Sequence, residues 1–227
     1  MRTPIKRLAG RLPQRWQQNI KRIYYARQIR RGRFRSEEPE WRGLSDLVSP
    51  GDWVIDVGAN VGQYTLRLSE LVKSGGRVFA FEPIPLTFEL LTANCALSSY
   101  RNVTLFNVAA SDAGDVASMH VPEWEPGGSL NLAEAHLSVG RGGDGLSCDI
   151  VTCRIDALEL KHRVSFVKVD AEGHEVQVVQ GMMQLIERDH PVLVVEGSRA
   201  NSLLESLGYA GDHQSGSPNW VWRYRGH

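Results

Sequence analysis

The chain has few cysteines and lacks a long apolar segment. Only three of its 227 residues are cysteine, Cys95, Cys148 and Cys153, and no two of them have Cys-x-x-Cys spacing. This pattern predicts neither a disulfide framework nor a zinc site, and it favours a reducing compartment. No apolar run approaches the roughly 20 residues that cross a bilayer, and the N-terminal residues lack the apolar core of a secretory signal. We therefore expect a cytoplasmic protein.

Acidic residues are absent from the first 36 positions. This segment carries 12 of the 26 Lys and Arg residues, whereas all 26 Asp and Glu residues follow it. The formal net charge of zero thus hides a basic arm attached to an acidic body. We expect residues 1–36 to form this arm and residues 37–227 to form one α/β domain, because the length supports a single sizeable core.

The arm is predicted to contain a basic amphipathic helix over residues 13–29. Its apolar residues recur at helical spacing between arginines and lysines: Trp16, Ile20, Ile23 and Tyr24. Such a helix either packs on the body or contacts an anionic surface such as a membrane. Nucleic acid is the less favoured partner, because the body that would face the phosphates is acidic.

A turn between a strand and a helix provides the first candidate site. The run from Val54 to Val57 is too short for a helix and is rich in β-branched residues. Gly58 and Gly62 then allow the chain to turn sharply and a ligand to approach closely, and Asn60 tolerates a left-handed backbone. The following helix directs its N-terminal amides at the turn, which favours a nucleotide-like ligand.

Polar residues also follow the next two predicted strands. The strand 77–81 ends at Glu82, about twenty residues beyond Gly62, where a Rossmann-like fold places the carboxylate that binds ribose. Ser111 and Asp112 follow the strand 103–108. Because strands and helices alternate, we expect a parallel sheet whose carboxyl edge holds the ligand. Asp112 is also consistent with a simple turn.

A charged cluster follows the predicted strand 164–169. Alternation places Lys168 and Asp170 on one side of this strand, and Glu172, His174 and Glu175 surround Gly173. So many titratable groups together are untypical of a core and indicate a site. Strands at 191–195 and 220–224 are expected to complete the sheet, and the glycine-rich segment 122–147 is predicted to be a substrate lid inserted in the domain.

Three motifs carry a resemblance to a known family: Asp56-Val-Gly-Ala-Asn-Val-Gly62, Phe81-Glu82-Pro83, and Lys168-Val-Asp-Ala-Glu-Gly-His-Glu175 followed by Val179-Gln-Gly181. Over residues 50–197 the chain resembles the FkbM family of S-adenosylmethionine-dependent methyltransferases. The resemblance implies a Rossmann-like class I methyltransferase fold, with helices on both faces of a mostly parallel seven-stranded sheet whose last strand is antiparallel. It also implies methyl transfer from S-adenosyl-L-methionine to a hydroxyl of a sugar, glycolipid or secondary metabolite.

The same resemblance assigns the site residues. The cofactor would be bound by Asp56, Gly58, Ala59, Asn60 and Gly62 at its methionine part, by Glu82 at the ribose, and by the Ser111 and Asp112 edge at the adenine. The candidate catalytic residues are Lys168, Asp170, Glu172 and His174. His174 has the ordinary pKa best suited to accept a proton, whereas Asp170 is closer to the cofactor by strand position. A Mg2+ ion held by Asp170 and Glu196 is the less favoured alternative.

Two other functions share parts of this pattern. A nicotinamide-dependent oxidoreductase would use the same glycine turn and ribose carboxylate, but the chain has no Tyr-x-x-x-Lys pair typical of short-chain dehydrogenases. A non-catalytic nucleotide-binding module would use the fold as a scaffold. That alternative leaves the charged cluster at 168–175 without a purpose.

Overall fold

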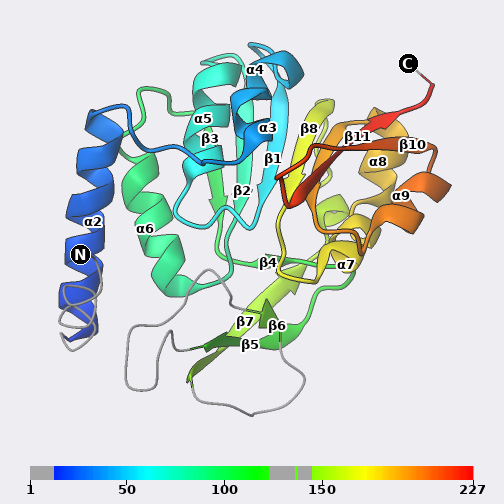
Figure 1. Ribbon diagram of the computed structural model, residues 1–227. Helices are drawn as coiled ribbons and strands as arrows, with labels where there is room; N and C mark the ends of the chain where they lie inside the picture. Colours follow the sequence, from blue (N-terminus) through cyan, green and yellow to red (C-terminus); the bar gives the residue numbers. More distant parts are fainter. Residues whose placement is uncertain (1–12, 123–135, 138–144, 227) are drawn as a thin grey trace.

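A seven-stranded sheet forms the centre of the computed structural model, which describes residues 13–122, 136–137 and 145–226 (Figure 1). The strand order is β10-β11-β9-β8-β1-β2-β3. Strands β1, β2, β3, β8 and β9 are parallel, and β11 runs antiparallel to both of its neighbours. Their bounds are β1 Trp53–Val57, β2 Arg77–Phe81, β3 Val103–Phe106, β8 Val164–Val169, β9 Val192–Glu196, β10 Tyr209–His213 and β11 Asn219–Tyr224. The predicted sheet is confirmed, although β10 was not anticipated.

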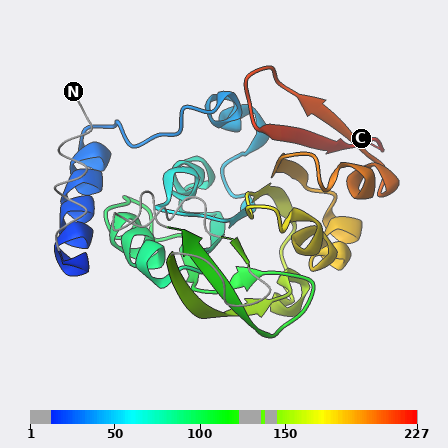
Figure 2. The same ribbon diagram turned by 60° about the horizontal axis from the view of Figure 1, so that its bottom comes forward.

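Helices cover both faces of the sheet (Figures 1 and 2). Alternation along β1 explains the two cores: Val54 packs with Leu68 of one helical layer, and Ile55 packs with Ile186 of the other. The first layer contains α5 (Gln63–Val72) and α6 (Pro85–Cys95), and the second contains α7 (Glu175–Gln180), α8 (Met183–Asp189) and α9 (Asn201–Ser206). The predicted helices on both faces are therefore confirmed.

A smaller sheet lies beyond the carboxyl ends of the central strands (Figure 1). Its strand order is β4-β7-β5-β6, and β5 pairs antiparallel with β7. The bounds are β4 Ala109–Ala110, β5 Val116–Pro122, β6 His136–Leu137 and β7 Gly145–Cys153, and the 3-10 helix η1 (Ile155–Leu158) then leads to β8. The third predicted strand thus ends at Phe106, and the chain changes sheets at Ala109. Most of the predicted lid, 122–147, lies outside the described residues.

Ser36 followed by Glu37 and Glu38 is typical of a helix start and predicts one helix to about Val48, but the segment does not form this single helix. It forms two four-residue helices, α3 (Pro39–Arg42) and α4 (Leu44–Leu47), separated by Gly43. The hydroxyl oxygen of Ser36 accepts a hydrogen bond from the backbone N–H of Glu38 at 3.2 Å. Ser36 therefore closes a turn before α3 and is not the N-cap of a long helix.

Helix α2 (Gln14–Arg30) is the helix of the basic arm, whose described residues are 13–36, and it lies along α6 (Figure 1). Ile29 near its end and Phe34 after it pack against a cluster that contains Leu91 and Cys95 of α6. In the described part of the chain, no helix combines the length and the apolar character needed to span a bilayer. The division into arm and domain and the cytoplasmic location stay predictions.

The apolar periodicity of residues 175–188 predicts one helix, but in the structure this helix is divided at Gly181. A Cβ atom on Gly181 would lie 1.9 Å from the carbonyl oxygen of Ser111, so only glycine lets the end of β4 approach this point. The φ angle of Gly181 is −75°, which any residue adopts, and the requirement is therefore one of space. The carbonyl of Gly181 also accepts a hydrogen bond from the N–H of Asp156 at 3.0 Å.

Gly181→Ala is expected to destabilise the fold, because the backbone of Ser111 must move away from the added methyl group. Overpacking of this kind costs about 1–3 kcal/mol of the free energy of unfolding, which urea denaturation measures. Gly43→Ala is the matched control, because Gly43 also ends a helix with negative φ (−82°) and an added Cβ would lie 3.6 Å from the nearest atom. Equal losses in both variants would contradict the steric explanation.

Candidate active site

A cavity of about 180 Å³ lies at the carboxyl edge of the central sheet, where the smaller sheet closes over it. Loops after four parallel strands and residues of the smaller sheet form its wall. The lining residues are Val57, Gly58, Asn60, Phe81, Glu82, Pro83, Ile84, Val108, Ala109, Ala110, Met119, Asp170, Ala171, Glu172, His174 and Glu196. This is the edge at which open parallel sheets bind their ligands.

The glycine turn after β1 brings two strand ends together. Gly58 has φ of +72°, and a Cβ there would lie 1.8 Å from the carbonyl oxygen of Asp170. Because Gly58 has no Cβ atom, the ends of β1 and β8 can be in contact below the cavity. Gly62 has φ of +94°, and a Cβ there would lie 2.8 Å from Leu91 of α6. Asn60 adopts the expected left-handed conformation with φ of +49°.

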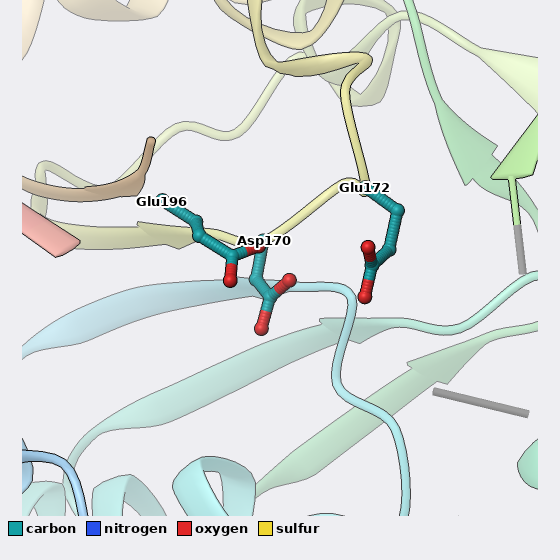
Figure 3. Close-up of side chains that lie close together, drawn as sticks. All are labelled: Asp170, Glu172 and Glu196. Carbon is teal, nitrogen blue, oxygen red and sulfur yellow. The ribbon is translucent and has the colours of Figure 1, made fainter. Parts of the chain in front are cut away.

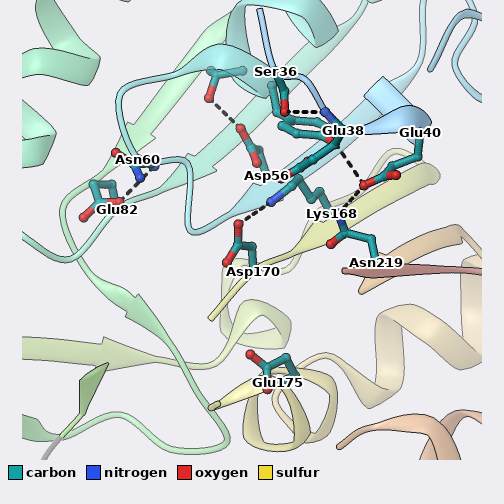
Figure 4. Close-up of polar contacts among 12 residues, drawn as sticks. Ser36, Glu38, Glu40, Asp56, Asn60, Glu82, Lys168, Asp170, Glu175 and Asn219 are labelled. Carbon is teal, nitrogen blue, oxygen red and sulfur yellow. Dashed lines mark hydrogen bonds and ion pairs between the residues drawn. The ribbon is translucent and has the colours of Figure 1, made fainter. Parts of the chain in front are cut away.

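Glu82 is fixed in the cavity wall at the end of β2. One carboxylate oxygen accepts a hydrogen bond from the backbone N–H of Asn60 at 2.9 Å (Figure 4). The other oxygen accepts one from the backbone N–H of Ile84, also at 2.9 Å. Burial raises the pKa of Glu82 to about 7, although these two hydrogen bonds oppose the shift. Each oxygen keeps a second lone pair, so the carboxylate is oriented to accept hydrogen bonds from a ligand.

Three carboxyl groups lie close together on the other side of the cavity. Asp170, Glu172 and Glu196 each place one oxygen within 4.8 Å of the others (Figure 3). Burial raises the pKa of Glu196 to about 8, and a hydrogen bond to Asp170 adds to the shift. Burial alone would raise the pKa of Asp170, but Lys168 and the hydrogen bond from Glu196 hold it below its ordinary value. At neutral pH the proton therefore resides on Glu196 and the charge on Asp170.

Lys168 lies beneath the site and does not line the cavity. Its ammonium nitrogen is 2.8 Å from Asp170 and 4.7 Å from the centre of the Tyr64 ring, and only 2% of the residue is exposed. Neighbouring Asp56 is fully buried and accepts a hydrogen bond from the hydroxyl of Thr65 at 2.6 Å (Figure 4). Burial opposes the charge of Lys168, yet Asp170 and Asp56 raise its pKa, so it remains the buried counter-charge.

Two glutamates that the sequence did not predict join this buried network from the segment before α4. The hydroxyl of Tyr64 donates a hydrogen bond to Glu38, and Glu40 accepts hydrogen bonds from Ser217 and Asn219 near the opposite end of the chain (Figure 4). Nothing in their local sequence indicated these contacts, because their partners are 26 to 179 positions away.

His174 is joined to Ser111 behind the cavity wall. Its Nε2 atom is 2.9 Å from the hydroxyl oxygen of Ser111, which in turn donates its proton to Asp112 at 3.0 Å. Because the serine proton is used, Nε2 must carry the hydrogen, which leaves a lone pair on Nδ1. Burial lowers the pKa of His174, although Asp112 and Glu175 oppose this shift. The imidazole is therefore neutral at neutral pH.

The structure divides the predicted site residues into two groups. Those that line the cavity are Gly58, Asn60, Glu82, Asp170, Glu172 and His174, and those that lie outside its wall are Asp56, Ala59, Gly62, Lys168, Ser111 and Asp112. The roles assigned to both groups stay predictions. Sequence reasoning missed the apolar wall of Ile84, Val108 and Met119, because it forms only when the smaller sheet folds against β2.

Comparisons with known proteins agree with this geometry. A family model described as the methyltransferase FkbM domain matches residues 56–209. The chain is 28% identical over 178 residues to the hexuronic acid methyltransferase AglP of Haloferax volcanii, covering 78% of this chain and 67% of AglP. It is 51% identical over 47 residues to the 31-O-demethyl-FK506 methyltransferase FkbM of Streptomyces tacrolimicus, covering 21% of this chain and 18% of that protein.

The crystal structure of the methyltransferase FkbM from Methylobacillus flagellatus KT has a similar fold, with a TM-score of 0.52 and 16% identity. The match covers 82% of this chain but 50% of that chain, so this chain spans about half of its length. The likeness confirms the predicted Rossmann-like class I methyltransferase fold. Because the family model also spans more than half of this chain, from Asp56 in β1 to Tyr209 in β10, the chain belongs to the FkbM family of methyltransferases.

Proposed function

We propose that this protein is an S-adenosylmethionine-dependent O-methyltransferase whose acceptor is a hydroxyl of a sugar, a glycolipid or a secondary metabolite. One observation carries the proposal: Glu82, with both oxygens oriented by backbone N–H groups, and His174, a neutral base, line the same cavity. A carboxylate that binds a ribose and a group that takes a proton are the two parts that such a transfer requires.

The cavity residues fit the methyl donor. The Glu82 carboxylate would accept hydrogen bonds from the two ribose hydroxyls, and the apolar side chains of Ile84, Val108 and Met119 would cover the adenine ring. Gly58 and Asn60 would lie at the methionine part. When bound, S-adenosylmethionine supplies an activated methyl group, so the protein has to orient the acceptor oxygen and remove its proton.

His174 is the residue that we assign to proton removal. Glu196 is protonated at neutral pH and does not accept a proton, and the low pKa that Lys168 imposes on Asp170 makes this carboxylate a weak base. The lone pair on Nδ1 of His174 is available, and Ser111 holds the opposite side of the ring. Asp170 is left to accept a hydrogen bond from the acceptor and to stabilise the imidazolium that forms.

The relatives support a hydroxyl acceptor. AglP is named a hexuronic acid methyltransferase, and the Streptomyces relative is named for a 31-O-demethyl substrate. The sequence at the end of β8 is Val-Asp-Ala-Glu. Enzymes that methylate the amino groups of bases resemble one another in an Asn or Asp followed by Pro-Pro and an aromatic residue at this strand end, and this chain lacks that pattern.

The first test compares cofactors by thermal shift. We expect S-adenosylhomocysteine to raise the melting temperature and NADH to leave it unchanged, because binding to the native state stabilises it. Glu82→Gln should weaken S-adenosylhomocysteine binding about 10- to 100-fold, since hydrogen bonds to a charged group contribute about 1.5–3 kcal/mol. Glu89→Gln, which changes an exposed residue of α6, is the control.

The same measurement at two pH values tests the role of the Glu82 charge. Because the pKa of Glu82 is about 7, lowering the pH through this value protonates the carboxylate and removes an acceptor. Affinity for S-adenosylhomocysteine should therefore be lower on the acid side, and Glu82→Gln should lose this dependence. Stabilisation by NADH without any effect of S-adenosylhomocysteine would favour the oxidoreductase and reject the methyltransferase cofactor.

The second test follows transfer of labelled methyl groups into cell extract, with mass spectrometry to identify the methylated product. His174→Ala should lower transfer about 10²- to 10⁴-fold while binding of S-adenosylhomocysteine is retained. The wild-type rate should fall as the pH drops below the His174 pKa, which is itself below 6.5. Ser111→Ala should change the pH at which the rate falls, because it removes the hydrogen-bond partner of Nε2. Methyl transfer by His174→Ala at the wild-type rate would contradict the assignment of His174 as the base.

The third test concerns metal dependence. Metal ligands must be deprotonated, whereas Glu196 holds its proton up to about pH 8 and Lys168 already neutralises Asp170. We therefore expect methyl transfer to be unchanged by EDTA and by added Mg2+. Loss of transfer in EDTA and recovery with Mg2+ would instead assign Asp170, Glu172 and Glu196 as ligands.

A further inference from the structure

Helix α2 exposes four large apolar residues to solvent. Trp16, Ile20, Ile23 and Tyr24 are 63%, 47%, 71% and 56% exposed. Their spacing of three and four residues places them on one face of the helix.

The opposite face of α2, which is turned toward α6, mixes polar and apolar groups. Gln18 is buried there, and the partly buried residues beside it are Lys21, Tyr25, Ala26, Gln28 and Ile29. Packing on α6 therefore accounts for this mixed face, but it leaves the second, apolar stripe of the helix exposed. Such an apolar stripe on a surface requires an explanation, because single exposed apolar residues are ordinary but grouped ones mark binding surfaces.

Arginines surround this apolar stripe. Arg22, Arg27, Arg30 and Arg31 line a groove of about 560 Å³ between α2 and α6, to which Ile23 also belongs. The sequence of α2 contains no acidic residue. Within the part of the chain that the structure describes, no ion pair neutralises these four arginines. The surface thus combines unpaired positive charge with exposed large apolar side chains.

The position of α2 relates this surface to the cavity. α2 lies at the outer edge of the molecule beside α6, and its first turns extend toward the end where β5 and β7 lie (Figures 1 and 2). Met119 of β5 lines the cavity. A flat surface that contacts the start of α2 would therefore face the end of the molecule at which the cavity is closed.

We propose that α2 binds the surface of an anionic phospholipid bilayer, with Trp16, Ile20, Ile23 and Tyr24 entering the boundary of the acyl chains and the four arginines contacting lipid phosphates. Indole, phenol and aliphatic groups favour this boundary, and basic residues beside them favour anionic headgroups. Nucleic acid would use the arginines but leave Ile20 and Ile23 in water. A second copy of the chain would bring identical arginine clusters together, and like charges repel.

Co-sedimentation with lipid vesicles tests this proposal without any need for catalysis. The full chain should sediment with phosphatidylcholine vesicles that contain phosphatidylglycerol, and it should stay in the supernatant with phosphatidylcholine alone. The double variant Trp16→Ser, Ile23→Ser should lose at least tenfold in vesicle affinity, and so should Arg27→Gln, Arg30→Gln. Circular dichroism and the response to S-adenosylhomocysteine verify that both variants are folded.

A matched control removes exposed apolar residues elsewhere. Val116 and Val151 are 67% and 52% exposed and pair across β5 and β7, so Val116→Ser, Val151→Ser should bind vesicles as the wild type does. No sedimentation of the wild type, or equal loss in this control, would overturn the proposal. The proposal would also be overturned if Trp16→Ser, Ile23→Ser bound vesicles normally, or if these substitutions converted a dimer into a monomer. A wild-type protein that bound RNA more tightly than vesicles, with that RNA binding lost in the variant, would overturn it as well.

Discussion

The buried ammonium group of Lys168 is the interaction on which the candidate site depends. It neutralises Asp170 at the cavity rim and Asp56 in the next strand, and it lies against the ring of Tyr64. Removing one partner of such a buried set leaves uncompensated charge in a region without water. Lys168, whose catalytic role stays a prediction, therefore lies beneath the cavity and holds the pKa of Asp170 below its ordinary value.

Close backbone contacts determine where the site can form. Gly58 lets the end of β1 contact the backbone of Asp170, and Gly181 lets the end of α7 contact the backbone of Ser111. The hydroxyl of Ser111 is hydrogen-bonded to His174. Both glycines leave space for a carbonyl oxygen of another segment. The two segments at each contact therefore lie closer together than a Cβ atom would permit. One of these contacts positions Asp170 at the cavity, and the other positions Ser111, which holds His174.

Buried hydrogen bonds join the segment directly after the arm to the rest of the protein. Glu38 and Glu40 follow the arm, and they contact Tyr64 and the residues before β11 in the same buried polar region that contains Lys168. α2 itself contacts α6 through a mixed face that includes Gln18 and Ile29, and it leaves Trp16, Ile20, Ile23 and Tyr24 exposed. An exposed apolar stripe and two glutamates that make buried hydrogen bonds thus occupy successive parts of one segment.

The sequence by itself determined the central sheet, its helical layers and the edge that carries the site, because β-branched runs, helical periodicity and residues at strand ends are local properties. The structure alone decided that Lys168 and Asp56 point beneath the site and that Ser111 holds His174, since these contacts join residues that are far apart in the chain. It also decided that the helix expected from Ser36 and the one at Gly181 are interrupted. At Gly181 the reason is the close approach of the Ser111 backbone, a contact with a distant segment that local helical preference cannot reveal.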